Sequence, residues 1–122
     1  MILETSKLIQ GSYLMIVGNN QIVRIESINY DDKTLVLCEF PDQIHRVNDP
    51  DFVGIKVSDR WLLKLDFESK YFKEDLGDGF DYELKDIRIR NYVKYPDVFN
   101  TFINDRLESG FEFVHEIQYY LS

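Results

Sequence analysis

Apolar and polar residues alternate in short runs through the first half of the chain, separated by polar or glycine-containing turns. Alternation with a period of two is typical of strands that bury one face. Five strands are predicted, at residues 13–17, 21–28, 33–40, 43–47 and 52–57. Short strands at this spacing favour a small bent antiparallel sheet, or an SH3-like barrel, in the N-terminal half.

The third of these strands has the apolar centre Leu35–Cys38, which indicates burial on both faces. Pro41 and Asp42 predict its end, because proline removes a donor from the hydrogen-bond ladder. Cys38 is therefore expected to be buried. It is the only cysteine in the sequence, so no internal disulfide can form and a reducing compartment is the simpler setting.

The second half mixes helical and strand patterns. Ser58 is a predicted N-cap with Asp59 in the first turn, and a short amphipathic helix is expected to follow and to end near Asp66. Residues 67–73 then return to strand alternation. Gly77 and Gly79 predict a hairpin turn, and residues 80–93 are expected to form one long strand, which makes a long β-hairpin.

The last residues change from alternation to helical spacing. In a helix over residues 113–121, Phe113, Val114, Ile117, Tyr120 and Leu121 fall on one side. This amphipathic pattern predicts a terminal helix that docks on the sheet. The expected fold is thus α+β, in a single domain over residues 1–122.

Side chains from several elements are expected to share the core. The predicted core positions are Trp61, Leu62, Leu65, Val36, Ile89 and Ile117.

Composition and charge narrow the classes of function. The 122 residues are 44% hydrophobic, enough for a packed core, and the net charge is −8. A negative envelope repels phosphate backbones, which disfavours general nucleic-acid binding. No apolar run is long enough to span a membrane, and the first residues lack a secretion-signal pattern. The two histidines and one cysteine have no metal-ligand spacing, so no metal or other cofactor is expected.

Three segments carry a resemblance to a known family. Leu8–Ser12 is loosely similar to an opening Leu-Arg-Ile-Gly-Asn, Val57–Glu68 to a central Leu-Thr-Glu-Glu-Trp-Leu-Leu-Lys-Leu-Gly-Phe-Glu, and Phe113–Leu121 to a closing Tyr-Val-His-Gln-Leu-Gln-Asn-Leu-Tyr. On these segments the chain resembles short, uncharacterised proteins of phages, prophages and mobile elements of Bacteroidota-type bacteria. Asp66 replaces the family's glycine. The resemblance implies a phage or mobile-element setting and no general activity. The lack of a signal or membrane segment favours the cytoplasm, here that of an infected or lysogenic bacterium.

Two groups of residues are candidate ligand contacts. In a strand over Lys85–Lys94, alternation places Arg88, Arg90, Tyr92 and Lys94 on one face, where cations and a phenol can bind an anionic ligand. A solvated face paired with acids of a neighbouring strand is the alternative. His115 and Gln118 lie one helical turn apart, near enough to share a ligand or to satisfy backbone groups.

No nucleophile–base or catalytic-motif spacing is present, so an enzyme is not expected. The favoured hypothesis is a non-catalytic counter-defence protein of a phage or mobile element. It would act on a host factor, by protein–protein contact or by sequestering a small nucleotide signal. A structural or assembly component of a virion is the alternative, and a small hydrolase with unrecognised carboxylates is least favoured. Self-association is left open.

Overall fold

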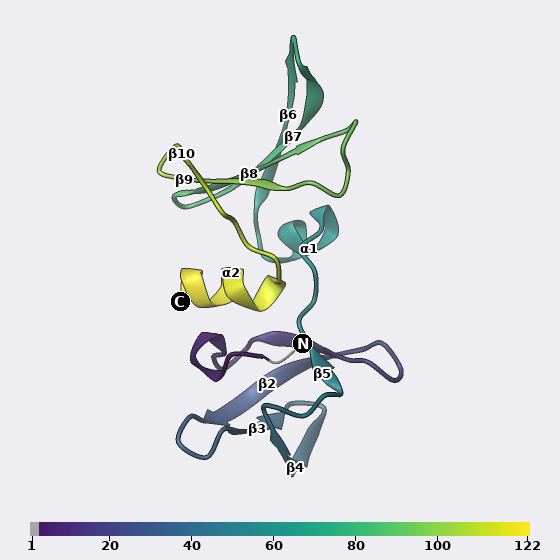
Figure 1. Ribbon diagram of the computed structural model, residues 1–122, viewed down its shortest axis with the longest axis vertical. Helices are drawn as coiled ribbons and strands as arrows, with labels where there is room; N and C mark the ends of the chain where they lie inside the picture. The colour runs from purple at the N-terminus through teal and green to yellow at the C-terminus, as the bar shows by residue number, and fades with distance from the viewer. Residues whose placement is uncertain (1–2) are drawn as a thin grey trace. The chain divides into compact units, whose positions relative to one another are not determined.

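The computed structural model describes residues 3–122, which form mostly antiparallel β-sheet with two α-helices (Figure 1). The expected α+β class is confirmed at this coarse level. The chain divides into two compact units. One is the chain up to Lys56 together with Glu112–Ser122, and the other is Val57–Phe111. A single domain over the whole chain stays a prediction.

The first unit is built on a five-stranded antiparallel sheet in the order β4-β3-β2-β1-β5. Its strands are β1 (Tyr13–Ile16), β2 (Gln21–Asn29), β3 (Thr34–Leu37), β4 (Phe40–Arg46) and β5 (Phe52–Val53). All five predicted strands are present, although β3 and β5 are shorter than expected. Their inward side chains make one apolar core, which contains Leu3, Leu8, Leu14, Val23, Ile25, Leu35, Leu37, Val47 and Phe52.

The predicted boundary between the third and fourth strands is wrong. The chain turns at Cys38 and Glu39, and Pro41 lies inside β4. Proline is tolerated there because β4 is an outer strand, where a missing donor costs the sheet no hydrogen bond. Cys38 is consequently exposed rather than buried.

The terminal helix is confirmed as α2 (Val114–Leu121) and packs on the first unit, against β1 and the 3₁₀ turn η1 (Thr5–Lys7). Glu116 starts the helix, because its carboxylate accepts the backbone N–H groups of Glu112 and Phe113 at 2.9 and 2.8 Å. Position 54 must be glycine, because its backbone lies close against Phe113, the residue that precedes α2. A Cβ there would lie 2.7 Å from the Phe113 ring.

The second unit begins with α1 (Asp59–Lys64), the short central helix that the sequence predicts. The Ser58 hydroxyl caps it by accepting the Trp61 N–H at 3.3 Å. Asp66 follows the helix with φ of 73°. This left-handed conformation is the one that glycine adopts without strain and that commonly ends a helix.

A second five-stranded antiparallel sheet follows, in the order β10-β9-β8-β7-β6. Its strands are β6 (Glu68–Glu74), β7 (Gly77–Leu84), β8 (Ile87–Tyr92), β9 (Asn100–Ile103) and β10 (Arg106–Glu108).

The predicted long strand over residues 80–93 is therefore wrong, since Lys85 and Asp86 form a two-residue turn between β7 and β8. The turn before it is at Asp75 and Leu76. Gly79, expected in that turn, pairs inside β7, where a Cβ would lie 2.1 Å from the Asn91 carbonyl oxygen.

The core predictions are confirmed for Leu62, Ile89 and Ile117, which are at most 1% exposed. Trp61, Leu65 and Val36 are only half-buried. Tyr82, Ile87 and Thr101 complete a buried strip on one face of the second sheet. Across residues 3–122, no helix has both the length and the apolar content that a membrane span requires.

Candidate functional site

The predicted cationic face is partly assembled on β8. Arg88, Arg90 and Tyr92 alternate along this strand and so share one face of the second sheet, whereas Lys94 lies in the turn beyond the strand's end. The second group, His115 and Gln118, belongs to α2 in the other unit. The two predicted groups are therefore parts of different compact units.

The guanidinium of Arg90 is hydrogen-bonded and stacked by residues of its own unit. Its Nε–H and Nη2–H donate to the two carboxylate oxygens of Asp81 at 2.7 and 2.9 Å, and Nη1–H donates to Glu74 at 2.9 Å. The guanidinium also stacks 4.0 Å from the centre of the Phe72 ring. The hydrogen bonds to Asp81 raise the pKa of Arg90 well above its ordinary range. Its charge is thus already neutralised.

Arg88 has a looser environment. It stacks on the Phe102 ring, 4.5 Å from the ring centre, and lies 3.8 Å from Asp81 and 3.9 Å from Asp105. Its Nε is buried and has no hydrogen-bond partner in the described residues. Both arginines therefore face carboxylates of their own sheet, which is the arrangement expected of a charge-paired sheet face rather than an anion site.

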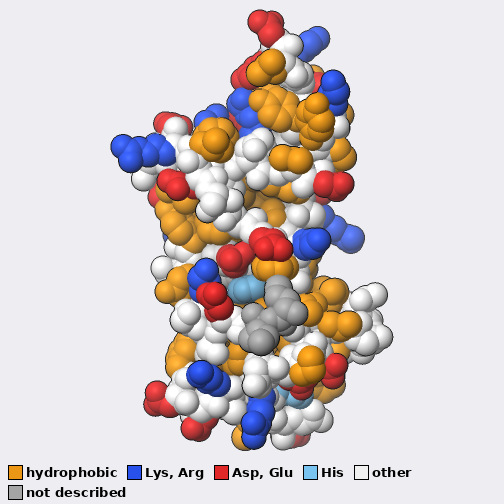
Figure 2. All heavy atoms as spheres, in the orientation of Figure 1, with side chains coloured by type: hydrophobic (Ala, Val, Ile, Leu, Met, Phe, Trp, Pro, Cys, Tyr) orange, Lys and Arg blue, Asp and Glu red, His pale blue; other side chains and the backbone are white. Residues whose placement is uncertain are grey.

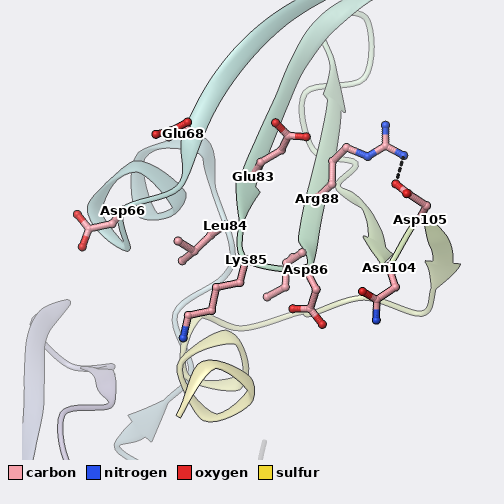
Figure 3. A pocket seen from close by; sticks show the side chains of 10 residues that line it. Asp66, Glu68, Glu83, Leu84, Lys85, Asp86, Arg88, Asn104 and Asp105 are labelled. Atoms are coloured by element: carbon pink, nitrogen blue, oxygen red, sulfur yellow. Dashed lines mark ion pairs between the residues drawn. The ribbon is translucent and has the colours of Figure 1, made fainter.

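A groove of 570 Å³ opens beside this face, within the second unit (Figure 3). Asp66 and Glu68 line one side, and Arg88 and Asp105 line the other. Its charged lining consists of the carboxylates Asp66, Glu68, Glu83, Asp86 and Asp105 and the cations Lys85 and Arg88. Five acids against two bases make the groove net negative.

The groove's charges are unevenly compensated. Glu83 is bound to Lys70 at 2.9 Å, and Asp105 lies beside Arg88. Asp66 and Glu68 form no ion pair with any residue in the described part of the chain. The pKa of Lys70 is raised mainly by its hydrogen bond to Glu83 and also by the charge of Glu68, so Glu68 does attract this lysine. A concave surface with more carboxylates than cations attracts cations and repels phosphates.

The groove is not among the sites that the sequence predicts. It forms where the turn at Lys85 and Asp86 approaches the end of α1 and the β9–β10 turn, and that turn was expected to be strand. The sequence does contain a signal for this turn, which is a change in the phase of the apolar and polar alternation. Leu84 and Ile87 are three residues apart, which breaks a period of two.

Gln118 is a docking residue of α2. Its side-chain carbonyl oxygen accepts the Tyr13 N–H at 2.8 Å, and its amide donates to the Gly11 carbonyl at 2.9 Å. Both groups belong to the segment that enters β1. Gln118 therefore satisfies backbone groups of the first unit, the structural role that the sequence left open beside ligand binding.

His115 is 4% exposed and stacks on the Phe113 ring, with ring centres 5.7 Å apart. Its Nδ1 has no hydrogen-bond partner among residues 3–122. It borders a hollow of 210 Å³ that Glu4, Lys7 and Glu112 also line. Burial is the main cause that lowers the pKa of His115 below its ordinary value of 6.5. The ring is therefore neutral at pH 7.

This lowered pKa predicts an acid-sensitive first unit. Below pH 6.5 the unfolded chain binds a proton at His115 before the folded chain does, so protonation favours unfolding. The urea midpoint should fall more between about pH 7 and about pH 5 in the unaltered protein than in His115→Gln, which has no titrating ring. Equal losses in the two proteins would contradict a buried, neutral His115.

No metal site is evident in the described residues, in which no three or more His, Cys, Asp or Glu side chains are arranged to hold an ion. Comparisons with family models, curated proteins and solved structures find no match to the chain. Inference about function therefore depends on the chain's own geometry.

Proposed function

We propose that this chain is a non-catalytic binding protein that holds a cationic segment of another protein in the groove of its second unit. The observation that carries the proposal is the groove's excess of three negative charges, with Asp66 and Glu68 lacking an ion-pair partner in the described residues. A lysine- or arginine-rich segment supplies the charge that this surface attracts.

The same geometry favours protein contact over sequestering a nucleotide. A phosphate on the β8 face would compete with Asp81 and Glu74 for Arg90, whose donors are already engaged. It would also lie close to the carboxylates of the groove. A phosphate that displaced the Asp81 carboxylate from Arg90 would gain little binding free energy, because one charge-assisted pair would only replace another.

The setting follows from the resemblance described above. In a phage or mobile element, the binding partner would be a host factor in the bacterial cytoplasm, and the chain would act as a counter-defence protein. This part of the proposal has the family resemblance as its support.

A direct test measures binding of a fluorescent oligolysine peptide to the full chain. Glu68→Lys changes the groove by two charges and should weaken binding about fivefold or more, because the added cation faces the peptide in a partly screened site. Asp42→Lys is the matched control, since it makes the same change on an exposed residue of β4 in the other unit. Binding to the control should stay near that of the unaltered protein.

Two outcomes would overturn the proposal. Equal weakening in Glu68→Lys and Asp42→Lys would mean that only overall charge attracts the peptide. A higher melting temperature with cyclic or linear nucleotides, combined with no response to oligolysine, would instead favour the nucleotide alternative.

A virion assembly component is the second candidate. The outer strand β6, seven residues long and without proline, favours it because open edges allow sheets of neighbouring molecules to join. The SH3-like architecture proposed for the first unit would also suit such a component. Particles or filaments of purified protein in electron micrographs would support this candidate over a cytoplasmic binding protein.

A further inference from the structure

The outer strands of the two sheets differ in how well they are protected from further pairing. Of these strands in the described chain, β4 contains Pro41, β5 has two residues and β10 has three. Proline and shortness are the usual means by which proteins protect an edge. The fourth outer strand, β6, has seven residues, no proline and continuous pairing to β7 along its length.

The register shows which backbone groups of β6 point away from the sheet. Glu74 and Gly77 flank the two-residue turn and pair directly, as the closing residues of a hairpin do. Hydrogen-bonded and non-bonded pairs alternate along an antiparallel ladder. Phe72, Lys70 and Glu68 therefore bond to β7.

The alternate residues Ser69, Tyr71 and Lys73 direct their N–H and C=O groups outward. The neighbouring strand supports this assignment. The Asp78 carbonyl accepts the Val93 N–H at 3.0 Å, so Asp78 bonds toward β8 and not toward Lys73, its partner in the register. Six backbone groups of β6 thus form an open edge.

Aromatic side chains lie beside this edge. Tyr71 is 58% exposed and Phe80 is 39% exposed, and their rings meet edge to face with centres 5.7 Å apart. The Tyr71 hydroxyl donates to Asp78 at 2.8 Å, which holds the ring along the face. Figure 2 shows hydrophobic side chains gathered over the β6–β7 hairpin on the visible face. An exposed aromatic pair beside an open edge is a surface suited to pairing.

We propose that two copies of this chain pair through β6, antiparallel, with Tyr71 of one copy opposite Tyr71 of the other. This register places Ser69 opposite Lys73 at both ends, and it joins all six outward groups of each copy to those of the other. A shift by two residues leaves one of the three positions opposite Asp75 or Phe67, both of which lie outside β6. The second-unit sheets of the two copies would join into one ten-stranded sheet. The Tyr71 and Phe80 rings of both copies would then form one stripe on a face of that sheet.

The charges of β6 favour a second copy as the occupant. The strand has two acids, Glu68 and Glu74, and two lysines, so its edge is neutral although the whole chain has a net charge of −8. Lys70 forms an ion pair with Glu83, and Glu74 forms one with Arg90. Two of the four charges of β6 are therefore already neutralised within their own chain. In the proposed register Glu68 lies opposite Glu74 of the other copy, and the bond of Glu74 to Arg90 of its own chain offsets the repulsion of this like-charge pair. The dimer does not rest on the groove's proposed ligand, although Glu68 belongs both to β6 and to the groove lining.

Sedimentation equilibrium on the full chain tests the dimer. The unaltered protein should be dimeric well below about 1 mM. Tyr71→Lys should shift the protein to monomer, because it sets two cations opposite each other. Tyr119→Lys, at a similarly exposed tyrosine of α2, should leave the dimer intact. Ser69→Pro removes only an outward donor, so it should also give a monomer whose far-ultraviolet circular dichroism is unchanged.

Crosslinking tests the register. In a Cys38→Ser background, Tyr71→Cys should form an intermolecular disulfide under mild oxidation, because residues in a hydrogen-bonded pair have Cα atoms about 5.5 Å apart. Lys73→Cys is the control, since its counterpart in the other copy would be about 13 Å away. Crosslinking of Tyr71→Cys alone supports the proposal.

Three results would overturn it. An unaltered protein that stays monomeric up to about 1 mM would exclude pairing of two copies through β6. A dimer that persists in both Tyr71→Lys and Ser69→Pro would place the interface elsewhere. Equal crosslinking of Tyr71→Cys and Lys73→Cys would exclude the single register.

Discussion

Removal of residues 113–122 is expected to unfold the first unit, which is the largest effect predicted for any change in this chain. α2 buries Val114 and Ile117 completely, and Gln118 bonds to the backbone of Gly11 and Tyr13. The truncation exposes the core beneath the helix and removes the two hydrogen bonds that Gln118 makes to the backbone. Together these losses approach about 5 kcal/mol, comparable to the whole stability of a small unit.

Circular dichroism and the dispersion of amide resonances measure this outcome. Two point variants of α2 provide matched controls. Gln118→Ala should cost about 1–3 kcal/mol, because it removes the acceptor of the Tyr13 N–H and leaves the Gly11 carbonyl only its longer bond from Arg24 Nε, at 3.3 Å. Tyr119→Ala, at an exposed position, should change stability by less than about 0.5 kcal/mol. A truncated protein with a folded spectrum would show that α2 is dispensable.

The helices could be predicted because their signals are local. Ser58 is followed by a short apolar stripe, and the residues after Phe113 repeat at helical spacing, so caps and period identify both elements without any knowledge of the rest of the fold. The degree of burial was less predictable. Trp61 is on the expected helix and yet half-buried, since exposure depends on what packs against the helix.

The hairpins of the second sheet were harder to locate because glycine was read as a turn signal. Gly79 is needed for a close approach between strands, while Lys85 adopts a φ of 54° in the actual turn. The phase of the apolar and polar alternation indicates where the β7–β8 turn lies. Tyr82 and Leu84 share one face with Ile87 and Ile89, and the odd spacing from Leu84 to Ile87 marks the turn between them.

The candidate site depends on register, which no single segment specifies. Arg90 is directly opposite Asp81 only because the β7–β8 turn has two residues, and a turn longer by one residue would change which residues are paired. The alternation did predict that Arg88, Arg90 and Tyr92 share a face. Their partners could not be predicted, and those partners explain why the face is paired rather than open.

Arg90→Glu is expected to destabilise the second unit by about 3–5 kcal/mol, although charge reversals at exposed positions are usually mild. Arg90 and Asp81 have side chains only 15% and 13% exposed, so the substitution leaves a carboxylate poorly hydrated and adds a second one beside it and Glu74. Loss of stacking on Phe72 adds to the cost. Urea denaturation measures the effect.

Lys94→Glu is the matched control for Arg90→Glu, because it makes the same charge change just beyond the end of β8 at an exposed position. It should cost less than about 1 kcal/mol. The deficit of Arg90→Glu should shrink in acid, since protonation relieves the repulsion among adjacent carboxylates. The reciprocal exchange, Arg90→Glu with Asp81→Arg, should recover part of the loss by restoring an opposite pair. If Arg90→Glu were as stable as Lys94→Glu, Arg90 would not be held by Asp81 in solution, and the β8 face would again be a candidate anion site.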